Sequence, residues 1–169
     1  MADQLQDVEV GLKWNVVPRL AIIGHAQEKF TPETERTARQ VIREAIERLK
    51  PTTIVSGRSP MGGVDAWAEE IAAELGLETK ILAPKKNRWD GPGGFKERNL
   101  AIARNSDLVL VVVVRDYPPD FKGVRFELCY HCVRNGKTDL HVKSGACWTA
   151  WKAKNKAWLT IGDQEKEPT

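Results

Sequence analysis

The sequence predicts an α/β fold, Rossmann-like, with a mostly parallel central sheet and helices on both faces. The apolar residues of 19–23 and 108–114 are continuous, as in strands that helices cover on both faces. Strand and helix segments also alternate along the chain, which favours parallel pairing with right-handed crossovers. The five expected strands cover residues 19–23, 52–56, 79–84, 108–114 and 157–161.

The bulk composition excludes several classes of protein. The chain has 169 residues, enough for one domain over 1–169 with a core at about 16–162. Its formal net charge of +3, from 26 basic and 23 acidic residues, is too balanced to indicate a nucleic-acid partner. No apolar run is long enough to span a bilayer, and the first residues lack the pattern of a signal peptide. We therefore expect a cytoplasmic protein without a membrane partner.

The first two helices have clear sequence signals. Thr31-Pro32-Glu33 combines an N-cap residue, a proline at the first helical position and an acidic first turn. Apolar residues then recur at helical spacing from Ala38 to Leu49, and Lys50-Pro51 ends the helix. A second amphipathic run covers 64–75, with Gly76 expected at its C-terminal end.

A glycine-rich loop joins the second strand to the second helix. The segment 56–65 contains Gly57, Gly62 and Gly63. Glycines let backbone N–H groups approach a ligand closely, and a helix N-terminus carries a partial positive charge. A glycine loop between a strand and a helix therefore suits a phosphate. Arg58 would add a charged fork. The alternative is a tight strand-to-helix turn that binds nothing.

The second half of the chain is less regular. A basic, glycine-rich loop over 85–94 precedes a short helix at 95–104 and the strand at 108–114. Residues 124–133 fit either a helix or a strand. A loop of small residues at 143–150 precedes an expected helix at 151–156 and the last strand.

Four segments carry motifs that occur in the same order in one known superfamily. Residues 54–65 resemble its "VSGGARGAD" signature, and 22–25 resemble its opening strand and "AGSR" turn. Residues 93–99 resemble its "AGPxRN" helix start, with Trp89 placed like the tryptophan that precedes it. Residues 144–149 resemble the "GGT" turn before the final helix. These motifs are similar to those of the SLOG superfamily, which includes the Lonely Guy phosphoribohydrolases, the DNA-processing protein Smf/DprA and YspA/YpsA-like nucleotide sensors.

The resemblance is most specific to the YspA/YpsA-like branch. It implies a Rossmann-like fold, a nucleotide or nucleotide-derived ligand and assembly into a homo-oligomer. The chain departs from the pattern at Arg58, which stands where a second glycine is usual, and at His25 in the opening turn. Lonely Guy enzymes also carry a glutamate after the final glycine turn, whereas Ala150, Trp151 and Lys152 follow Thr149 here. The resemblance therefore supports a binding site more strongly than a reaction.

The candidate site residues follow the carboxyl ends of the predicted strands, where open α/β sheets bind ligands. Arg98, like Arg58, could bind a phosphate, or it could form a surface ion pair. Asp65 could accept from a ribose hydroxyl or stabilise its helix N-terminus, and His25 could act as an acid or base or cap a loop. The candidate catalytic residues are His25 and Asp65. The candidate binding residues are Gly24, Ser56, Gly57, Arg58, Gly62, Gly63, Asp65, Trp89, Gly94, Arg98, Asn99, Ser144, Gly145 and Thr149.

A separate group of cysteines and histidines falls within 126–148. All three cysteines of the chain and two of its three histidines lie there. The pattern C-x2-C-x8-H-x5-C offers four ligands of the kind that tetrahedral zinc takes, namely Cys129, Cys132, His141 and Cys147, with His131 as an alternative to His141. We expect one structural zinc ion in this insert. The alternative is that the cysteines are small core residues.

The sequence thus favours a sensor-like module that binds a small-molecule nucleotide or nucleotide derivative. One alternative is a phosphoribohydrolase-like enzyme that cleaves the N-glycosidic bond of a nucleotide, with His25 or Asp65 as acid or base. Another is a single-stranded nucleic-acid-binding protein that uses the basic loop at 85–88 and tryptophans such as Trp148. The balanced charge makes nucleic acid the least favoured partner.

Overall fold

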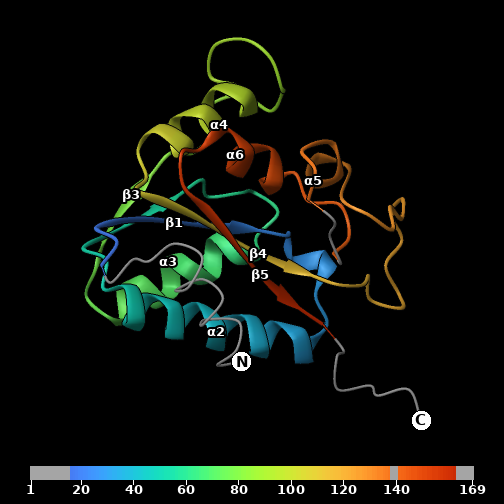
Figure 1. The fold of residues 1–169 in the computed structure, drawn as a ribbon, viewed down its shortest axis with the longest axis horizontal. Coiled ribbons are helices and arrows are strands. Elements are labelled where there is room, and N and C mark those ends of the chain that lie inside the picture. The colour runs from blue at the N-terminus through green and yellow to red at the C-terminus, as the bar shows by residue number, and fades with distance from the viewer. Residues whose placement is uncertain (1–15, 138–140, 163–169) are drawn as a thin grey trace.

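The structure is a computed structural model and describes residues 16–137 and 141–162. It is an α/β fold built on one five-stranded sheet, which confirms the predicted Rossmann-like class. All strands run parallel, in the order β3-β2-β1-β4-β5 (Figure 1). The strands are β1 (Arg19–Gly24), β2 (Thr53–Ser56), β3 (Glu78–Ile81), β4 (Leu108–Val114) and β5 (Lys156–Ile161).

The strands β1 and β4 pair at the centre of the sheet. All seven residues of β4 are buried, and so are the four apolar residues of β1. The register places Leu20 beside Ile54 of β2 and Leu108 of β4. Burial on both faces explains why neither apolar run alternates with polar residues.

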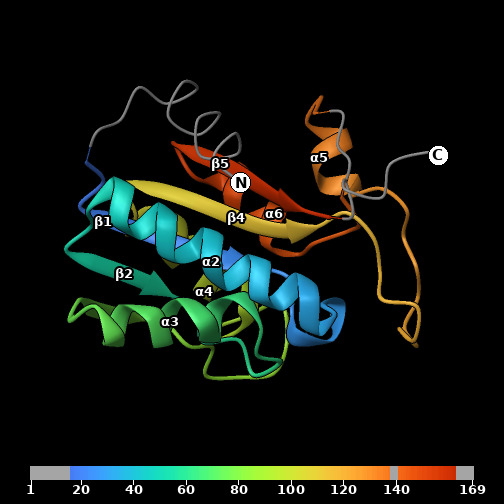
Figure 2. The same cartoon turned by 90° about the horizontal axis from the view of Figure 1, so that it is seen from below.

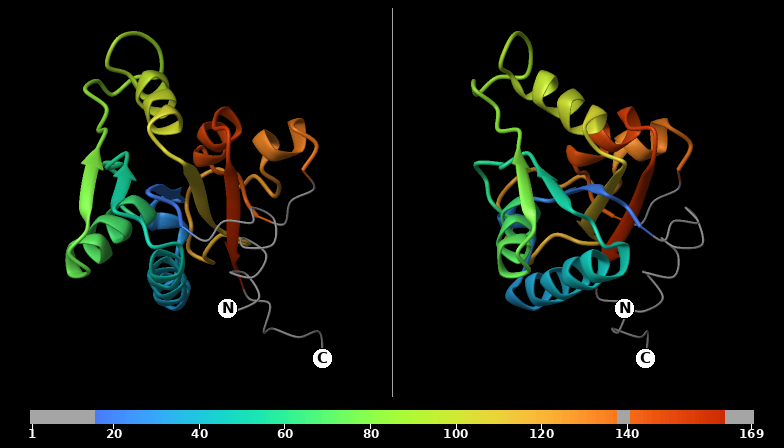
Figure 3. Two further views of the ribbon diagram at one scale, coloured as in Figure 1. Left: turned by 60° about the vertical axis from the view of Figure 1, so that its left-hand side comes forward. Right: turned by 90° about the vertical axis from the view of Figure 1, so that its left-hand side faces the viewer.

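Helices cover both faces of the sheet. They are the 3-10 helix η1 (Gln27–Lys29) and the α-helices α2 (Pro32–Leu49), α3 (Val64–Glu74), α4 (Phe95–Arg104), α5 (Tyr130–Arg134) and α6 (Ala146–Lys152). The helices α2 and α3 bury Leu20 and Ile22 on one face, whereas α4, α5 and α6 bury Ala21 and Ile23 on the other (Figures 2 and 3). No helix among the described residues is long and apolar enough to cross a bilayer.

The predicted start of α2 is confirmed in detail. Thr31 is the N-cap, and its hydroxyl accepts a hydrogen bond from the Thr34 N–H at 3.1 Å. The Thr34 hydroxyl accepts from the Thr31 N–H in return, which completes a capping box. The helix then packs beside α3, where Arg39 pairs with Glu70 at 2.7 Å.

Three boundaries predicted from the sequence are wrong. The strand β3 ends at Ile81 rather than at residue 84, although the Leu82 N–H still donates to β2. The ambiguous segment 124–133 is regular only from residue 130, where the short helix α5 begins, and this helix continues to residue 134. The helix α6 begins at Ala146, inside the predicted loop, and ends before the predicted helix does. Its small residues pack closely on the sheet, so they are helical core residues rather than signs of a loop.

Candidate functional site

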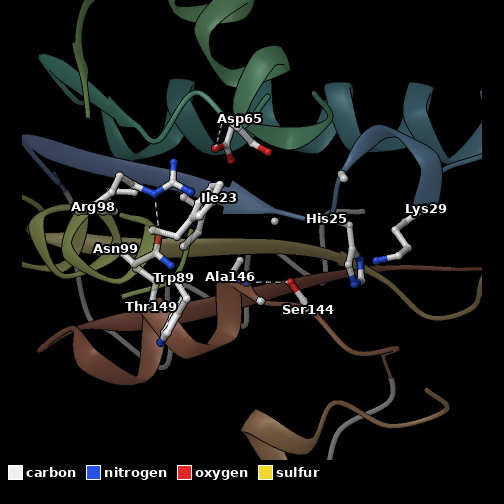
Figure 4. A pocket seen from close by; sticks show the side chains of 16 residues that line it. Ile23, His25, Lys29, Asp65, Trp89, Arg98, Asn99, Ser144, Ala146 and Thr149 are labelled. Atoms are coloured by element: carbon white, nitrogen blue, oxygen red, sulfur yellow. Dashed lines mark hydrogen bonds between the residues drawn. The ribbon is translucent and has the colours of Figure 1, made fainter. Parts of the chain in front are cut away.

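A cavity of about 310 Å³ opens at the carboxyl edge of the sheet, at the end of β1, the strand that pairs with β2 on one side and β4 on the other. The strand order reverses there, which is where doubly wound sheets bind ligands. Figure 4 shows Asp65 of α3 on one side and Ser144 and Thr149 on the opposite side. Nine of the predicted site residues line this cavity: Gly24, His25, Asp65, Trp89, Arg98, Asn99, Ser144, Gly145 and Thr149.

Arg98 is the main cationic group at one end of the cavity. Its Nε donates to Asn99 Oδ1 at 2.7 Å, and its Nη1 donates to the carbonyl of Gly57. Among the described residues its second terminal nitrogen, Nη2, has no hydrogen-bond partner. Burial lowers the pKa of Arg98, which the nearby Asp65 carboxylate opposes. The guanidinium is thus positioned by uncharged groups and keeps a donor for a ligand.

Asp65 faces the same cavity from the first turn of α3. The residue is 7% exposed, and its Oδ2 accepts a hydrogen bond from the Ser59 N–H at 3.1 Å. Within the described part of the chain, Oδ1 has no hydrogen-bond partner. Burial raises the pKa of this carboxyl to about 6, although the Ser59 bond and the Arg98 charge oppose that shift. Asp65 therefore changes charge close to neutral pH.

His25 joins three segments at the edge of the cavity. Its Nδ1 accepts from the Val114 N–H at 3.0 Å, so the proton lies on Nε2, which donates to the Lys143 carbonyl at 2.9 Å. Burial lowers the pKa of His25 to about 3. The ring is neutral, and both nitrogens are engaged with the backbone. In this conformation neither nitrogen is available for the proton transfer that the sequence suggested.

The glycines of the 56–65 loop lie outside the cavity lining and serve close packing. A Cβ on Gly57 would lie 2.5 Å from Arg98 Nη1, so this glycine makes room for the guanidinium. Gly63 has φ +88°, and a Cβ there would lie 2.4 Å from the His25 carbonyl oxygen. Gly62 N–H bonds back to the Ser59 carbonyl at 3.1 Å. These three glycines therefore shape the cavity through their neighbours, whereas Ser59 and Asp65 of the same loop line it.

Arg58 and Ser56 also lie away from the cavity. Both side chains contact Glu69 of α3, Arg58 through Nη2 at 2.8 Å and Ser56 through its hydroxyl at 2.6 Å. The Arg58 side chain is 60% exposed. Gly94, the N-cap of α4, is likewise outside the lining, and a Cβ there would meet the carbonyl oxygen of Arg88 at 2.7 Å. These three predicted residues support the site from outside.

Lys29 is a lining residue that the sequence analysis did not identify. It stands on η1, and Figure 4 shows it beside His25, at the end of the cavity away from Arg98. Burial lowers its pKa, and the charge of Lys143 does so as well, while Glu28 raises it. Its position just after a strand end at the ligand-binding edge is a signal that would have indicated it.

Two tryptophans meet at the mouth of the cavity. The rings of Trp89 and Trp148 lie edge to face, with centroids 4.9 Å apart. Only Trp89 lines the cavity, and it is 43% exposed. Trp148 packs against Trp89 and does not line the cavity. Lys152 Nζ lies 5.2 Å from the centre of the Trp148 ring. Trp89 therefore offers an aromatic surface that its partner keeps in place.

The structure brings Cys129, Cys132, His141 and Cys147 into one buried cluster. Their ligand atoms all lie within 4.8 Å of one another. The His141 Nδ1 carries a proton that it donates to the Val142 carbonyl at 2.7 Å. Its Nε2 is thereby left as an acceptor, 3.7 Å from the sulfurs of both Cys132 and Cys147. His131 lies outside the cluster.

The cluster geometry matches the size of a metal-ligand tetrahedron. Zinc–sulfur and zinc–nitrogen bonds of ordinary length give ligand-to-ligand distances of about 3.6–3.8 Å. Trp158 Nε1 donates to Cys147 Sγ at 3.3 Å, a contact that stabilises charge on that sulfur. Hydrogen bonds from Cys132 and Cys147 lower the pKa of the Cys129 thiol, whereas hydrogen bonding to Cys129 and Cys132 raises the pKa of the Cys147 thiol. The metal-free cluster therefore favours a thiolate at Cys129, the form that binds metals.

Comparisons with known proteins do not identify the family. No family model and no curated protein matches this chain. Among solved structures, the chain is similar to DNA processing protein A (DprA) from Streptococcus pneumoniae, with 20% sequence identity and a TM-score of 0.37. The match covers 62% of this chain and 42% of that one, so the chain spans less than half of its length. The site is therefore argued from its own geometry.

The raised pKa of Asp65 predicts a pH-dependent effect of Asp65→Asn. The folded protein holds this proton up to about pH 6, whereas an unfolded aspartate loses it near 3.8. The wild-type protein should therefore lose stability relative to Asp65→Asn as the pH rises between those values. We expect the free energy of unfolding of the variant, minus that of the wild type, to increase by about 2 kcal/mol between pH 4.5 and 7.5. Urea unfolding at the two pH values measures this.

Asp107→Asn is the matched control. Hydrogen bonding to Arg19 lowers the pKa of Asp107, so this group stays ionised across the same pH range. The difference in free energy of unfolding between Asp107→Asn and the wild type should therefore be nearly constant with pH. A constant difference for Asp65→Asn as well would show that Asp65 ionises normally.

Proposed function

We propose that the cavity binds a nucleotide or nucleotide-derived ligand, in a sensor-like module. The observation that carries this proposal is that Arg98 and Asp65 both line the cavity. Each keeps one atom for a ligand, Nη2 of Arg98 and Oδ1 of Asp65. A guanidinium is a charged donor that suits phosphate oxygens, and the Nη2 of Arg98 is the nitrogen left to contact one. A carboxylate oxygen suits a ribose hydroxyl. Both stand at the strand-order switch point, where this kind of sheet binds ligands.

The remaining lining residues suit the same ligand class. The volume of about 310 Å³ lies at the small end of ligand pockets and fits a mononucleotide better than a dinucleotide. Lys29 adds a second positive charge at the other end. The exposed Trp89 offers a stacking surface for a base. The hydroxyl of Thr149, a residue 1% exposed, has no hydrogen-bond partner among the described residues and faces the cavity.

Arg98→Gln should weaken nucleotide binding, whereas Arg58→Gln should not. The first change removes the charged donor from the cavity, and the second removes a guanidinium that contacts Glu69 outside it. Losing a charge-assisted hydrogen bond costs about 1.5–3 kcal/mol, so we expect affinity to fall at least about tenfold. A thermal-shift screen of mononucleotides, NAD and ADP-ribose on the wild type and both variants measures this, because ligands of the native state raise the melting temperature.

Each melting temperature is compared with that of the same variant without ligand, which separates binding from stability. The proposal fails if no nucleotide stabilises the wild type. It also fails if Arg98→Gln and Arg58→Gln lose the same fraction of the shift.

The environment of Asp65 favours cleavage of a nucleotide N-glycosidic bond as a second candidate function. A buried carboxyl with a pKa of about 6 can act as a general acid or base near neutral pH. Release of free base from nucleoside monophosphates should then be lost in Asp65→Asn and kept in Asp107→Asn. Release that persists in Asp65→Asn would exclude Asp65 as the acid or base.

We also propose that the Cys129, Cys132, His141 and Cys147 cluster holds one structural zinc ion. Four buried donors whose ligand atoms lie within 4.8 Å of one another, with the His141 tautomer already fixed, support this. Three thiolates and a neutral imidazole are a ligand set that zinc takes in closed structural sites. A closed site of this kind contributes folding energy directly.

Elemental analysis of protein purified without chelator should find one zinc per chain. Cys132→Ser should lose the metal and melt at a lower temperature, because it removes one of four ligands. His131→Asn, next to Cys132 in sequence and outside the cluster, is the matched control and should retain the metal. Protein that lacks stoichiometric metal, or Cys132→Ser that keeps it, would contradict the zinc site.

A further inference from the structure

We infer that the metal cluster and the ligand cavity are coupled through a shared wall, so that metal occupancy sets the affinity of the cavity. The wall is the segment 142–149, which supplies Ser144, Gly145, Ala146 and Thr149 to the cavity lining. This inference goes beyond ligand binding and zinc binding taken separately, and it rests on the proposed function of the cavity.

One cluster residue directly precedes the wall in the sequence, and a second lies within it. His141 precedes the cavity-lining residues of the wall, and Cys147 lies between Ala146 and Thr149. Both cluster residues are fully buried, as are Ser144 and Thr149 to within 2%. A bond from each to one metal ion would fix the spacing across the turn that carries Ser144 and Gly145. Residues of the cluster and residues of the cavity lining therefore share one short stretch of backbone.

The described contacts that position the wall are few outside the cluster. Within the wall, Ser144 accepts from the Ala146 and Cys147 N–H groups, which shapes the turn but does not attach it to the sheet. Among the described hydrogen bonds outside the cluster, Val142 N–H donates to the Val114 carbonyl and His25 donates to the Lys143 carbonyl, both at the N-terminal end of the wall. Towards its C-terminal end, the hydrogen bond to the sheet is made by a cluster residue, because Trp158 Nε1 of β5 donates to Cys147 Sγ.

The two other cluster residues belong to a different segment. Cys129 is the N-cap of α5, and Cys132 lies within that helix. The helices α5 and α6 have five and seven residues, too short to be stable without tertiary contacts. A metal ion would cross-link them. Cys129 Sγ already lies 3.8 Å from the Ser144 carbonyl oxygen, so the cluster reaches the turn itself.

His25 connects the two sites directly. Its ring lines the cavity and meets the His141 ring edge to face, with centroids 6.2 Å apart. Displacement of His141 would therefore change the packing of His25, and with it the hydrogen bond to Lys143. The cluster thus affects the cavity through the wall and through this ring contact.

The consequence is a reciprocal coupling. Without metal the wall is less restrained, and a ligand must pay the entropy of ordering it, so its affinity falls. By linkage, the ligand must strengthen metal binding by the same factor. Coupling of this kind typically amounts to about 5- to 150-fold in affinity.

The experiment compares metal-loaded protein with protein treated with chelator, using adenosine 5′-monophosphate as the ligand. Hydrogen–deuterium exchange gives a readout that needs no ligand. We expect zinc to slow the exchange of 142–149 and to leave β2 and α2 unchanged, which also shows that the chelated protein stays folded. Calorimetry should show that chelation weakens binding of the nucleotide by at least about fivefold. Cys132→Ser should behave like the chelated protein, and His131→Asn like the loaded one.

The outcomes separate the coupling from the proposed function. Equal nucleotide affinity with and without zinc would overturn the coupling, as would unchanged exchange of 142–149. If zinc protects 142–149 but no nucleotide binds either form, the proposed ligand fails while the metal-held wall stands. Zinc protection of the wall together with a zinc-dependent affinity supports both.

Discussion

The junction of β1 with β4 is the constraint on which the rest of the site depends. A Cβ on Gly24 would lie 1.9 Å from the Val112 carbonyl oxygen, so only glycine lets β1 end this close to β4. The next residue, His25, then bonds to the end of β4 and to the Lys143 carbonyl. Its ring must remain neutral for both bonds to persist, and burial ensures this. The cavity forms around this junction.

The glycine loop at 56–65 has a different role from the one that its composition suggests. Its glycines are required by close contacts, with the Arg98 guanidinium at Gly57 and with the His25 carbonyl at Gly63. The positive charge in the cavity comes from α4 and η1 instead, through Arg98 and Lys29. Because the glycine backbone of this loop is used for packing, ligand recognition depends on the side chains that line the cavity. The proposed recognition is therefore that of a guanidinium and a carboxylate rather than of a phosphate-binding loop.

The cluster around His141 gives the least regular part of the fold a structural centre. Among its described residues, the segment from β4 to β5 contains only two short helices, and the four buried ligand atoms lie where those helices meet. The same backbone also lines the cavity, through Ser144, Gly145, Ala146 and Thr149. In the proposed coupling, metal binding would change the ligand affinity of the cavity without a large conformational change.

The sequence by itself determined the fold class, the start of α2, the central strands and the three cysteines of the cluster, whereas the tertiary structure selected His141 over His131 as its fourth member. The features that the sequence determined follow from local patterns, namely continuous apolar runs, capping residues and ligand spacing. Tertiary structure alone decided that Arg58 contacts Glu69, that Arg98 and Lys29 line the cavity, and that His25 has no free nitrogen. It also decided that α6 is helical from Ala146. Each of these depends on a partner far away in the sequence, which no local pattern specifies.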